Sequence, residues 1–454
     1  MKTVTAKECI QRIINENMLA YISERVHNPG IIQRIQRRVR RFIIMKKHII
    51  AALLLTVFAL TLMPAANQAN AASPAAPAIG AALPVVNLTN TAAPAANLAN
   101  TTTLASQQEI RIFIDGRQIT TDVAPRIVDD RTLVPISVIA QTLGAAVDWN
   151  NDERSVTIRR AYKEIVLFID NEYATVNGES IKLDVAPRII NDRTFLPVRF
   201  VAEQLAQKVG WENDERIVTI TDDMSFAYED SNIKAWMLGC GAILAAYDKN
   251  DPYCIGMNYR SVDNAASARR TLSGSWGCDD RVDLISTIYS MIDNGHAEGF
   301  AYDAFVANSL SDEDFEYRLS ISSPTDVYMW RLVKALSEKW GDKGVKAWDW
   351  FRMSHLAGWG YLAGYLELEE VYILVEAIAQ RLQSLFSSWE EATDNYMDGY
   401  AWWSRTDVSQ EGTVYKQRLQ IYEDLKAAQE TKGLLFDPDV WTQPVRGVIA
   451  EPEE

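Results

Sequence analysis

Histidine and cysteine are scarce in this chain, which has four of each among its 454 residues. Only two of the histidines, His296 and His355, lie beyond residue 71. A structural zinc site needs about four Cys or His ligands at close spacing, and no C-x-x-C pair is present. The sequence therefore excludes a zinc site of this kind, and we expect neither a bound metal nor a cofactor.

The cysteines are Cys9, Cys240, Cys254 and Cys278. Two of the last three could form a disulfide if the protein lies in an oxidising compartment, which would leave one odd thiol. The alternative is that all three are buried thiols.

Basic residues are in short supply toward the C-terminus. Residues 222–454 contain 20 Lys and Arg against 39 Asp and Glu, a net charge of −19. Nucleic-acid binding relies on basic residues that release counterions from the phosphate backbone. This acidic region therefore argues against nucleic acid as a partner.

Long apolar runs are rare, and the one that stands out is Ile49–Met63, fifteen residues without a charge. Met45-Lys46-Lys47 precede it, and Ala69-Asn70-Ala71 follow it. A charged start, an apolar stretch of about 7–15 residues and a small-x-small site are typical of a secretory signal peptide. We therefore predict a signal peptide at 45–71 and a location outside the cell or in the cell envelope.

The alternative is a single-pass membrane anchor. A helix that spans a bilayer needs about 20 apolar residues, and extending the run to Ala66 reaches eighteen. Residues 1–44 would then be a basic cytoplasmic tail; otherwise they are a doubtful N-terminal extension ahead of the true start at Met45. A membrane is a partner only if the signal segment stays uncleaved.

Residues 72–108 carry no charged side chain and consist largely of Ala, Pro, Asn, Thr and Leu. So little large apolar surface cannot offset the entropy that the chain would lose on ordering. We predict a disordered linker that holds the following domains away from the envelope.

An internal repeat with a spacing of 62 residues begins after this linker. Its clearest element, Asp122-Val-Ala-Pro-Arg-Ile127, returns as Asp184-Val-Ala-Pro-Arg-Ile189. Further identities keep the same register: Asp130-Arg-Thr132 with Asp192-Arg-Thr194, Pro135 with Pro197, Trp149 with Trp211, Asp152-Glu-Arg154 with Asp214-Glu-Arg216, and Val156-Thr-Ile158 with Val218-Thr-Ile220. So many identities in one register indicate a duplication, with repeats at about 109–160 and 171–221.

Each repeat is predicted to be a small α+β module. Apolar residues alternate in 110–114 and in 165–169, which predicts strands, and turns are expected at Asp115-Gly116 and Asn177-Gly178. The Asp-Asp-Arg-Thr and Asn-Asp-Arg-Thr segments suit tight turns, since Asn and Asp tolerate a left-handed backbone.

Helices are expected behind Pro135 and Pro197, because a proline in the first turn loses no helical hydrogen bond. The apolar residues that follow recur at helical spacing. Gly144 is expected to end the first helix, whereas the second is expected to run past Ala206 to Gly210.

Residues 109–221 resemble the copper amine oxidase N-terminal-like domain of surface proteins from Gram-positive bacteria. The resemblance rests on the Arg-Thr-(Leu/Phe)-(Val/Leu)-Pro motif and the Trp that follows it in each repeat. It implies a non-catalytic, stalk-like module. The oxidase chemistry of that name needs three His ligands for copper and a cofactor-forming Tyr. Asn395-Tyr396 superficially resembles that tyrosine, but His296 and His355 are too few to bind copper, so the protein is not expected to be an amine oxidase.

From residue 222 to about 440 the alternation gives way to helical periodicity, and an acidic tail follows at 441–454. Amphipathic helices are predicted at 235–246, 282–292, 327–339, 345–356, 369–389 and 414–426. The predicted architecture is therefore multidomain, with a duplicated small α+β module followed by an all-α helical domain of unknown function.

Within this helical domain, residues 233–405 resemble the uncharacterised bacterial family called domain of unknown function 1266. The motifs that carry the resemblance are Asn294-Gly-His296, Ala347-Trp-Asp-Trp-Phe-Arg352, Trp359-Gly-Tyr-Leu-Ala-Gly-Tyr365 and Ser388-Trp-Glu-Glu391, with Tyr396 to Tyr400 behind them. The family usually has an Arg after Gly-His, where this chain has Ala297. The resemblance implies no activity.

Four polar side chains in and beside these motifs are candidates for a catalytic site: His296, Asp349, Arg352 and Glu370. Asp349 and Arg352 are three residues apart, so on a helix they share a face and can pair. His296 could be a general base oriented by a carboxylate, or could cap a helix end beside Gly295. Aromatic side chains could instead form a binding surface, and the candidates are Trp348, Trp359, Tyr365, Trp402 and Trp403.

Two hypotheses about function remain. The first is a secreted or cell-surface, non-catalytic binding protein whose partner is a cell-wall polymer or another surface protein. The second is an extracellular hydrolase with a His and carboxylate site in the helical domain, although G-x-S-x-G, H-E-x-x-H and phosphate-loop motifs are missing. Convergence of the four polar candidates on one cleft would favour the hydrolase.

Overall fold

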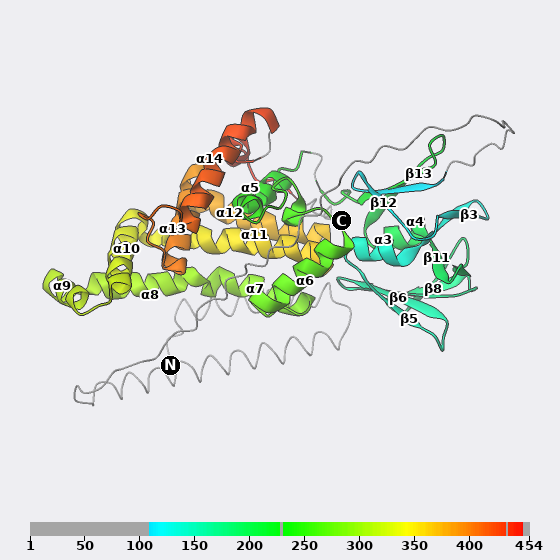
Figure 1. Ribbon diagram of the computed structural model, residues 1–454, viewed down its shortest axis with the longest axis horizontal. Helices are drawn as coiled ribbons and strands as arrows, with labels where there is room; N and C mark the ends of the chain where they lie inside the picture. The colour runs from blue at the N-terminus through cyan, green and yellow to red at the C-terminus, as the bar shows by residue number, and fades with distance from the viewer. Residues whose placement is uncertain (1–108, 228–229, 433–434, 448–454) are drawn as a thin grey trace, which may run out of the picture. The chain divides into compact units, whose positions relative to one another are not determined.

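The computed structural model describes residues 109–227, 230–432 and 435–447, which all belong to one compact unit of the chain (Figure 1). The predicted N-terminal extension, signal peptide and linker lie outside these ranges, as do the last seven residues of the predicted acidic tail. Within the described ranges, no helix is both long and apolar enough to cross a membrane.

The first part, residues 111–222, is rich in β-structure, as the alternating apolar pattern predicts. Its elements are β1 (Arg111–Ile114), β2 (Arg117–Ile119), β3 (Arg126–Val128), β4 (Arg131–Pro135), α3 (Ile136–Thr142), β5 (Ala146–Asn150), β6 (Ser155–Arg160), β7 (Lys163–Phe168), β8 (Tyr173–Val176), β9 (Glu179–Lys182), β10 (Arg188–Ile190), β11 (Arg193–Pro197), α4 (Val198–Gln204), β12 (Gln207–Glu212) and β13 (Ile217–Asp222). Elements β3 to β6 recur as β10 to β13 at the spacing of the sequence repeat. Both predicted turns are present, with left-handed backbone at Asp115-Gly116 and at Asn177-Gly178.

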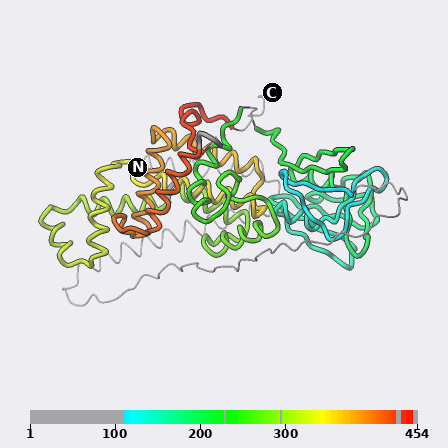
Figure 2. Tube along the Cα trace, turned by 45° about the horizontal axis from the view of Figure 1, so that its top comes forward, coloured from blue at the N-terminus to red at the C-terminus, as the bar shows by residue number. Residues whose placement is uncertain are grey.

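The two repeats do not fold as separate modules, because their strands share sheets. β1 of the first repeat pairs in parallel with β13 of the second, and β4 pairs antiparallel with β11. Figure 2 shows the two repeats interlaced. One apolar core built from both repeats lies beneath α3 and α4. The prediction of two small α+β units is therefore right in its elements but misses this exchange, which depends on contacts between residues far apart in the chain.

The second helix of the β-rich part ends earlier than the sequence suggested. α4 stops at Gln204, and Ala206 takes the left-handed conformation with φ of 56°. In the first repeat Gly144 has the equivalent role with φ of 83°. The expectation that α4 would run on to Gly210 is wrong, because strand β12 already starts at Gln207 and pairs with β13.

The second part is helical throughout the stretch from 233 to 442. Its elements are α5 (Ile233–Tyr247), η1 (Ile255–Met257), α6 (Val262–Trp276), α7 (Arg281–Asn294), α8 (His296–Ser309), α9 (Asp312–Ser320), α10 (Pro324–Trp340), η2 (Gly341–Lys343), α11 (Lys346–Ala363), α12 (Leu368–Leu385), α13 (Trp389–Ser404), α14 (Val414–Lys432) and α15 (Pro438–Thr442). The six predicted helices are present, but α12 ends at Leu385 and Trp389 already begins α13.

Helix α11 is the centre of this part. It contacts α5, α6, α7, α12 and α13, and most of its residues are buried (Figure 1). Gly360 allows one of these contacts, since a Cβ there would lie 2.4 Å from the Leu284 side chain of α7. The helical core is separate from the core of the β-rich part. Helix α11 therefore carries the motif Ala347 to Arg352 through the middle of the domain. The motif Trp359 to Tyr365 begins on α11 and ends just past its last residue, Ala363.

The contact between the β-rich and helical parts is polar and buried. The fully buried Arg160 at the end of β6 forms an ion pair with Glu367, the residue that precedes α12. Arg260, at the start of the helical part, binds both carboxylate oxygens of Asp115 and also Asp222. The hydroxyl of Tyr361 donates to Asp222 at 2.6 Å. We call these residues, with Gln207, the seam.

Two glycines let the backbones of the two parts touch at the seam. Gly144 and Gly364 both have positive φ, and a Cβ on Gly364 would lie 2.0 Å from the carbonyl oxygen of Gly144. Ala161 N–H donates to the carbonyl of Gly364 at 2.7 Å, and Arg269 donates to the carbonyls of Ala363 and Gly144. The β-rich part is thus packed against the helical part and is not a free stalk.

Candidate functional site

Three of the four predicted polar residues converge. His296 begins α8, and Asp349 and Arg352 lie one turn apart on α11. His296 Nδ1 lies 2.7 Å from Arg352 Nη1 and 3.5 Å from Asp349 Oδ1, and Arg352 lies 3.6 Å from the same carboxylate oxygen. We call these three side chains the His296 cluster.

Asp349 is occupied by the first turn of helix α8. Its buried carboxylate accepts the backbone N–H of His296 at 3.0 Å and that of Ala297 at 2.7 Å. These are N–H groups that have no partner inside their own helix, so Asp349 caps α8 from another helix. Gly295 makes room for this, because a Cβ there would lie 2.2 Å from Asp349 Oδ2.

The contact between Arg352 and His296 determines the tautomer of the imidazole. A guanidinium can only donate, so Nδ1 of His296 must accept, and the proton of the neutral ring is on Nε2. A hydrogen bond from Nδ1 to Asp349 would need the proton on Nδ1 instead, but that contact is longer, at 3.5 Å against 2.7 Å. We therefore assign the tautomer from the contact with Arg352. His296 therefore presents an N–H donor outward, and Nδ1 is not free to act as a base.

Arg352 is held between two indole rings. Its guanidinium carbon lies 4.6 Å from the ring centre of Trp276 and 4.8 Å from that of Trp348. Burial lowers the pKa of Arg352, and Asp349 partly counters that shift. Nε and Nη2 of Arg352 have no hydrogen-bond partner among the described residues. The guanidinium is thus fixed in place, and its Nε and Nη2 N–H groups remain able to donate hydrogen bonds to a ligand.

Trp403 completes the accessible edge of the site. Its ring stands edge-on to His296 at 6.2 Å and lies 5.5 Å from Trp348. Trp403 is 44% exposed and the His296 side chain 39%, whereas Trp348 is buried. The site is therefore a surface with an indole face and two kinds of N–H donor beside it.

Glu370 does not belong to this site. It lies in the first turn of α12, where its carboxylate accepts the backbone N–H of Glu367 in a capping box. It also forms an ion pair with Arg281 at 2.6 Å. The hypothesis that Glu370 joins His296 is therefore not supported, and its position follows from the preference of carboxylates for helix N-termini.

The other aromatic candidates are placed elsewhere. Trp402 packs against α8 farther along that helix than His296, donating its Nε1 to Asp303 at 3.1 Å and packing edge-on against Phe300. Trp359 is partly buried against the helical core, and the hydroxyl of Tyr365 donates to a backbone carbonyl of α7's leading loop. Only Trp348 and Trp403 of the five therefore contact the His296 cluster.

The segment Asn395-Tyr396 has a structural role. Asn395 is fully buried and bridges the start of α11, accepting from Ala347 N and donating to Gly344 O. Tyr396 stacks on Phe351 with ring centres 4.9 Å apart. Both side chains are used in joining α13 to α11.

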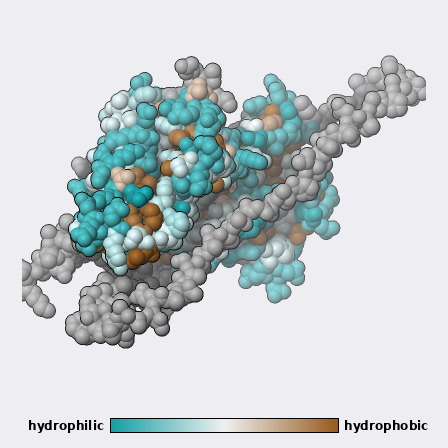
Figure 3. Space-filling view, turned by 60° about the vertical axis from the view of Figure 1, so that its left-hand side comes forward, coloured by the Kyte–Doolittle hydropathy of each residue, from teal (hydrophilic) through white to brown (hydrophobic). Residues whose placement is uncertain are grey.

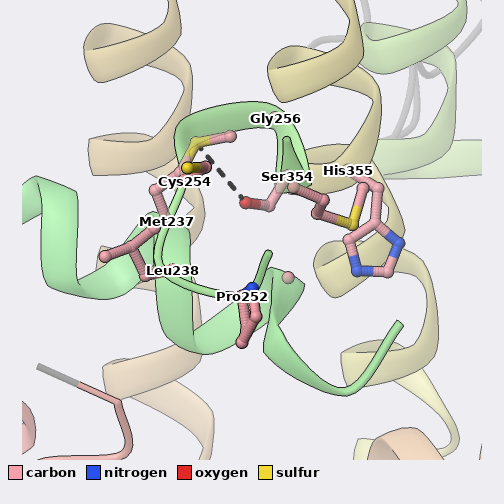
Figure 4. A pocket seen from close by; sticks show the side chains of 9 residues that line it. Met237, Leu238, Pro252, Cys254, Gly256, Ser354 and His355 are labelled. Atoms are coloured by element: carbon pink, nitrogen blue, oxygen red, sulfur yellow. Dashed lines mark hydrogen bonds between the residues drawn. The ribbon is translucent and has the colours of Figure 1, made fainter. Parts of the chain in front are cut away.

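A small hollow, with room for about one water molecule, lies between α5, η1 and α11 (Figure 4). Met237, Cys254, Ser354 and His355 are among the side chains around it. His355 is bound to the carbonyl of Cys240 at 2.9 Å, and burial lowers its pKa to about 3, so it is neutral. Burial, with a hydrogen bond to Asp251, raises the pKa of Cys254 to about 11, which leaves a thiol without nucleophilic character at neutral pH. The hollow is therefore a packing defect of the core and offers no catalytic group.

Cys240, Cys254 and Cys278 are all free thiols. Cys240 and Cys278 are buried and Cys254 is partly buried, which matches the alternative of three separate thiols better than the possible disulfide. In the part of the chain that the structure describes, no three His, Cys, Asp or Glu side chains are grouped to hold a metal ion.

Two members of the site were missed by reasoning from the sequence. Trp276 is the last residue of α6, some 76 residues before Arg352, and no local pattern links the two. Gly295 was noticed only as a neighbour of His296, although Gly-His at the junction of two helices was a usable signal. The φ of Gly295 is −74°, which any residue can adopt, so the close approach of Asp349 and not the backbone conformation requires glycine there.

Comparison with known families agrees with both predicted resemblances and their order. Residues 113–220 match the family Copper amine oxidase N-terminal domain. Residues 271–437 match the family Protein of unknown function (DUF1266), so this match begins and ends later than the predicted 233–405. The His296 cluster lies inside the second match.

Two proteins of Escherichia coli (strain K12) are similar to this chain. The Uncharacterized protein YbeR is 36% identical over 135 residues, which is 29% of this chain and 56% of YbeR. The Uncharacterized protein YbeU is 30% identical over 152 residues, or 34% of this chain and 64% of YbeU. The chain thus covers less than two thirds of either relative. No solved structure matches.

Proposed function

We propose that the protein is a non-catalytic binding protein, exported to the cell surface or medium, whose helical domain contacts its ligand through His296, Arg352 and Trp403. One observation carries the proposal. The polar groups that a hydrolase would need are already engaged: Asp349 caps α8, and Nδ1 of His296 accepts from Arg352. The free groups that remain are N–H donors and an exposed indole, which suit recognition.

The chemistry of the site favours a ligand with an acceptor or anionic group next to an apolar face. Nε2–H of His296 and the unpaired N–H groups of Arg352 would bind carboxylate, phosphate or hydroxyl oxygens. Trp403 would stack on a sugar ring or a peptide side chain. Both features fit a cell-wall polymer, and another surface protein is the alternative partner.

The test is co-sedimentation of the purified full chain with isolated cell walls of the producing bacterium. We expect the double variant His296→Ala/Trp403→Ala to lower the bound fraction at least about tenfold, as for a hot-spot pair. Tyr173→Ala, which removes an equally exposed aromatic from β8, should bind like the parent. Release of soluble wall fragments that depends on His296 would overturn the proposal in favour of the hydrolase.

Export is tested separately by fractionation and intact mass of the natively expressed protein. A product that starts near residue 72 in the medium or wall fraction is the expected result. A membrane-bound product that keeps residues 1–71 would show that the protein is anchored in the membrane and is not released by signal cleavage.

A further inference from the structure

Helix α8 has an apolar face that nothing covers among the described residues. Phe300 and Ala307 point into the core, whereas Tyr302 is 69% and Phe305 71% exposed on the other side. Ala301 is exposed beside them. A helix that is apolar on opposite faces is normally packed on both, and the described residues cover only one of these faces of α8.

This exposure is exceptional within the molecule. Tyr302, Phe305, Tyr317 at 67% and Ile321 at 68% are the four most exposed large hydrophobic side chains of the described residues, and no other exceeds 55%. The first two lie on α8, and the others lie on or directly after α9, which starts three residues after α8 ends. The side of the molecule where α8 to α10 lie shows an apolar area bordered by hydrophilic residues (Figure 3).

The charge around this face has one sign. Residues 296–320 contain six Asp or Glu and a single cation, Arg318, whose guanidinium lies 4.1 Å from the ring centre of Trp330. No cation pairs with Glu298, Glu313 or Glu316 in the described part of the chain, although Lys334 pairs with Asp312 at 3.3 Å. Solvated carboxylates beside exposed aromatics are complementary to a partner that is both basic and apolar.

We propose that the exposed face of α8, with the acidic helix α9, is a docking surface for a basic amphipathic helix of a partner protein. Such a helix would place its apolar residues on Tyr302 and Phe305 and its Lys or Arg residues opposite Glu313 and Glu316. A second copy of this chain would bring like charges together, and an anionic membrane would be repelled. The surface is separate from the His296 cluster, which faces Trp403 on α13, so the inference goes beyond the function proposed above.

The probe is an 18-residue peptide of leucine and lysine with leucines at i, i+3 and i+4 spacing, titrated into the purified full chain by fluorescence anisotropy. We expect binding that weakens with salt, and no binding of the same peptide with glutamate in place of lysine. Tyr302→Ser/Phe305→Ser should weaken the lysine peptide about tenfold or more. Glu313→Lys/Glu316→Lys should weaken it about as much and reduce the salt dependence.

Tyr173→Ser is the matched control, since it removes an exposed aromatic from the β-rich part, and it should leave the affinity unchanged. All four substituted side chains are exposed, so circular dichroism should show the parent fold. Equal affinity for parent and both double variants would overturn the proposal. Dimers in analytical ultracentrifugation that are lost on Phe305→Ser would assign the face to a second copy. Sedimentation with phosphatidylglycerol vesicles, lost on the same substitution, would assign it to a membrane.

Discussion

Two arginine–carboxylate clusters in this protein make an instructive pair. In the seam, Arg160 and Glu367 are both buried, and Nε and Nη2 of Arg160 and Oε1 of Glu367 have no hydrogen-bond partner among the residues that the structure describes. In the His296 cluster, only Asp349 is fully buried, and its contacts are helix N–H groups and Arg352. The first cluster joins two parts of the chain, whereas the second lies at the edge of the helical part with one side open.

The difference shows how the same residue types serve different purposes. A buried ion pair costs several kcal/mol of desolvation for each ion and adds little net stability. Removing one of its two partners nevertheless destabilises the fold strongly, because the other charge stays buried. At the open edge of the His296 cluster, the guanidinium of Arg352 keeps N–H donors free for a ligand. Accessibility of the donors therefore distinguishes a structural cluster from a candidate binding site, and the variants below test that distinction in order of expected effect.

The largest effect is expected in the seam. Arg160→Met leaves the Glu367 carboxylate buried without its cation, which should cost about 3–5 kcal/mol in the free energy of unfolding measured with urea. The double variant Arg160→Met/Glu367→Met should cost much less than the sum of the two single variants. Additive losses would show that the two side chains do not interact.

The same variant should respond to pH. Burial raises the pKa of Glu367, and the Arg160 guanidinium counters that shift. A carboxyl with a raised folded-state pKa binds its proton more readily in the folded protein, so the loss in Arg160→Met should shrink as pH falls toward 5. A loss that stays constant between pH 8 and pH 5 would contradict this assignment.

The second largest loss of stability is expected from substitution of Asp349. Asp349→Ala removes the cap of α8 and one partner of Arg352, with an expected loss of about 2–3 kcal/mol. Asp349→Asn keeps an oxygen for one of the two N–H groups, so it should lose less. The His296 amide should exchange with deuterium faster in Asp349→Ala, and unchanged exchange would argue against the cap.

The stability of the protein should depend on pH through His355. Because burial lowers the pKa of His355 to about 3 from 6.5, its contribution is present above pH 6.5 and is lost as pH falls toward 3. The free energy of unfolding should therefore fall by up to about 1.4 kcal/mol per pH unit in this window. His355→Gln, which can still donate to the carbonyl of Cys240, should flatten this slope.

The smallest effect on stability is expected at the open edge. His296→Ala and Trp403→Ala should each change the free energy of unfolding by about 0.5 kcal/mol or less, as is usual for surface positions. The wall-binding assay should nevertheless respond to both. A loss of 2 kcal/mol or more in either variant would place these residues with the structural cluster.

Much of the fold could be predicted because its signals are local. The Asp115-Gly116 turn follows from two adjacent residues, and the start of α3 follows Pro135 as expected. The repeat follows from short identical segments that recur at a fixed spacing of 62 residues. Helix α13 also had a readable start, since Ser388 caps the N–H of Glu391 in the Ser-x-x-Glu pattern. Helix α8 had no such start, because its cap comes from Asp349 on another helix.

The candidate site also has contacts that the sequence predicts and contacts that it does not. Spacing alone paired Asp349 with Arg352, and their distance of 3.6 Å confirms that they share a face of α11. Its place beside the family-like motifs grouped Glu370 with them, although the capping box of α12 and Arg281 hold it elsewhere. Proximity along the sequence predicts partners within one helix, and it does not predict which helix ends face each other.

By itself the sequence determined the order of the domains, some of the strands and several of the helices, because periodicity and turn residues act over one or two turns of chain. Only the tertiary structure decided that β1 pairs with β13, that Arg160 meets Glu367, and that His296 meets Arg352 beside Trp276. These contacts join residues far apart in the chain, and their choice depends on how whole faces pack and on which polar groups packing leaves to be satisfied.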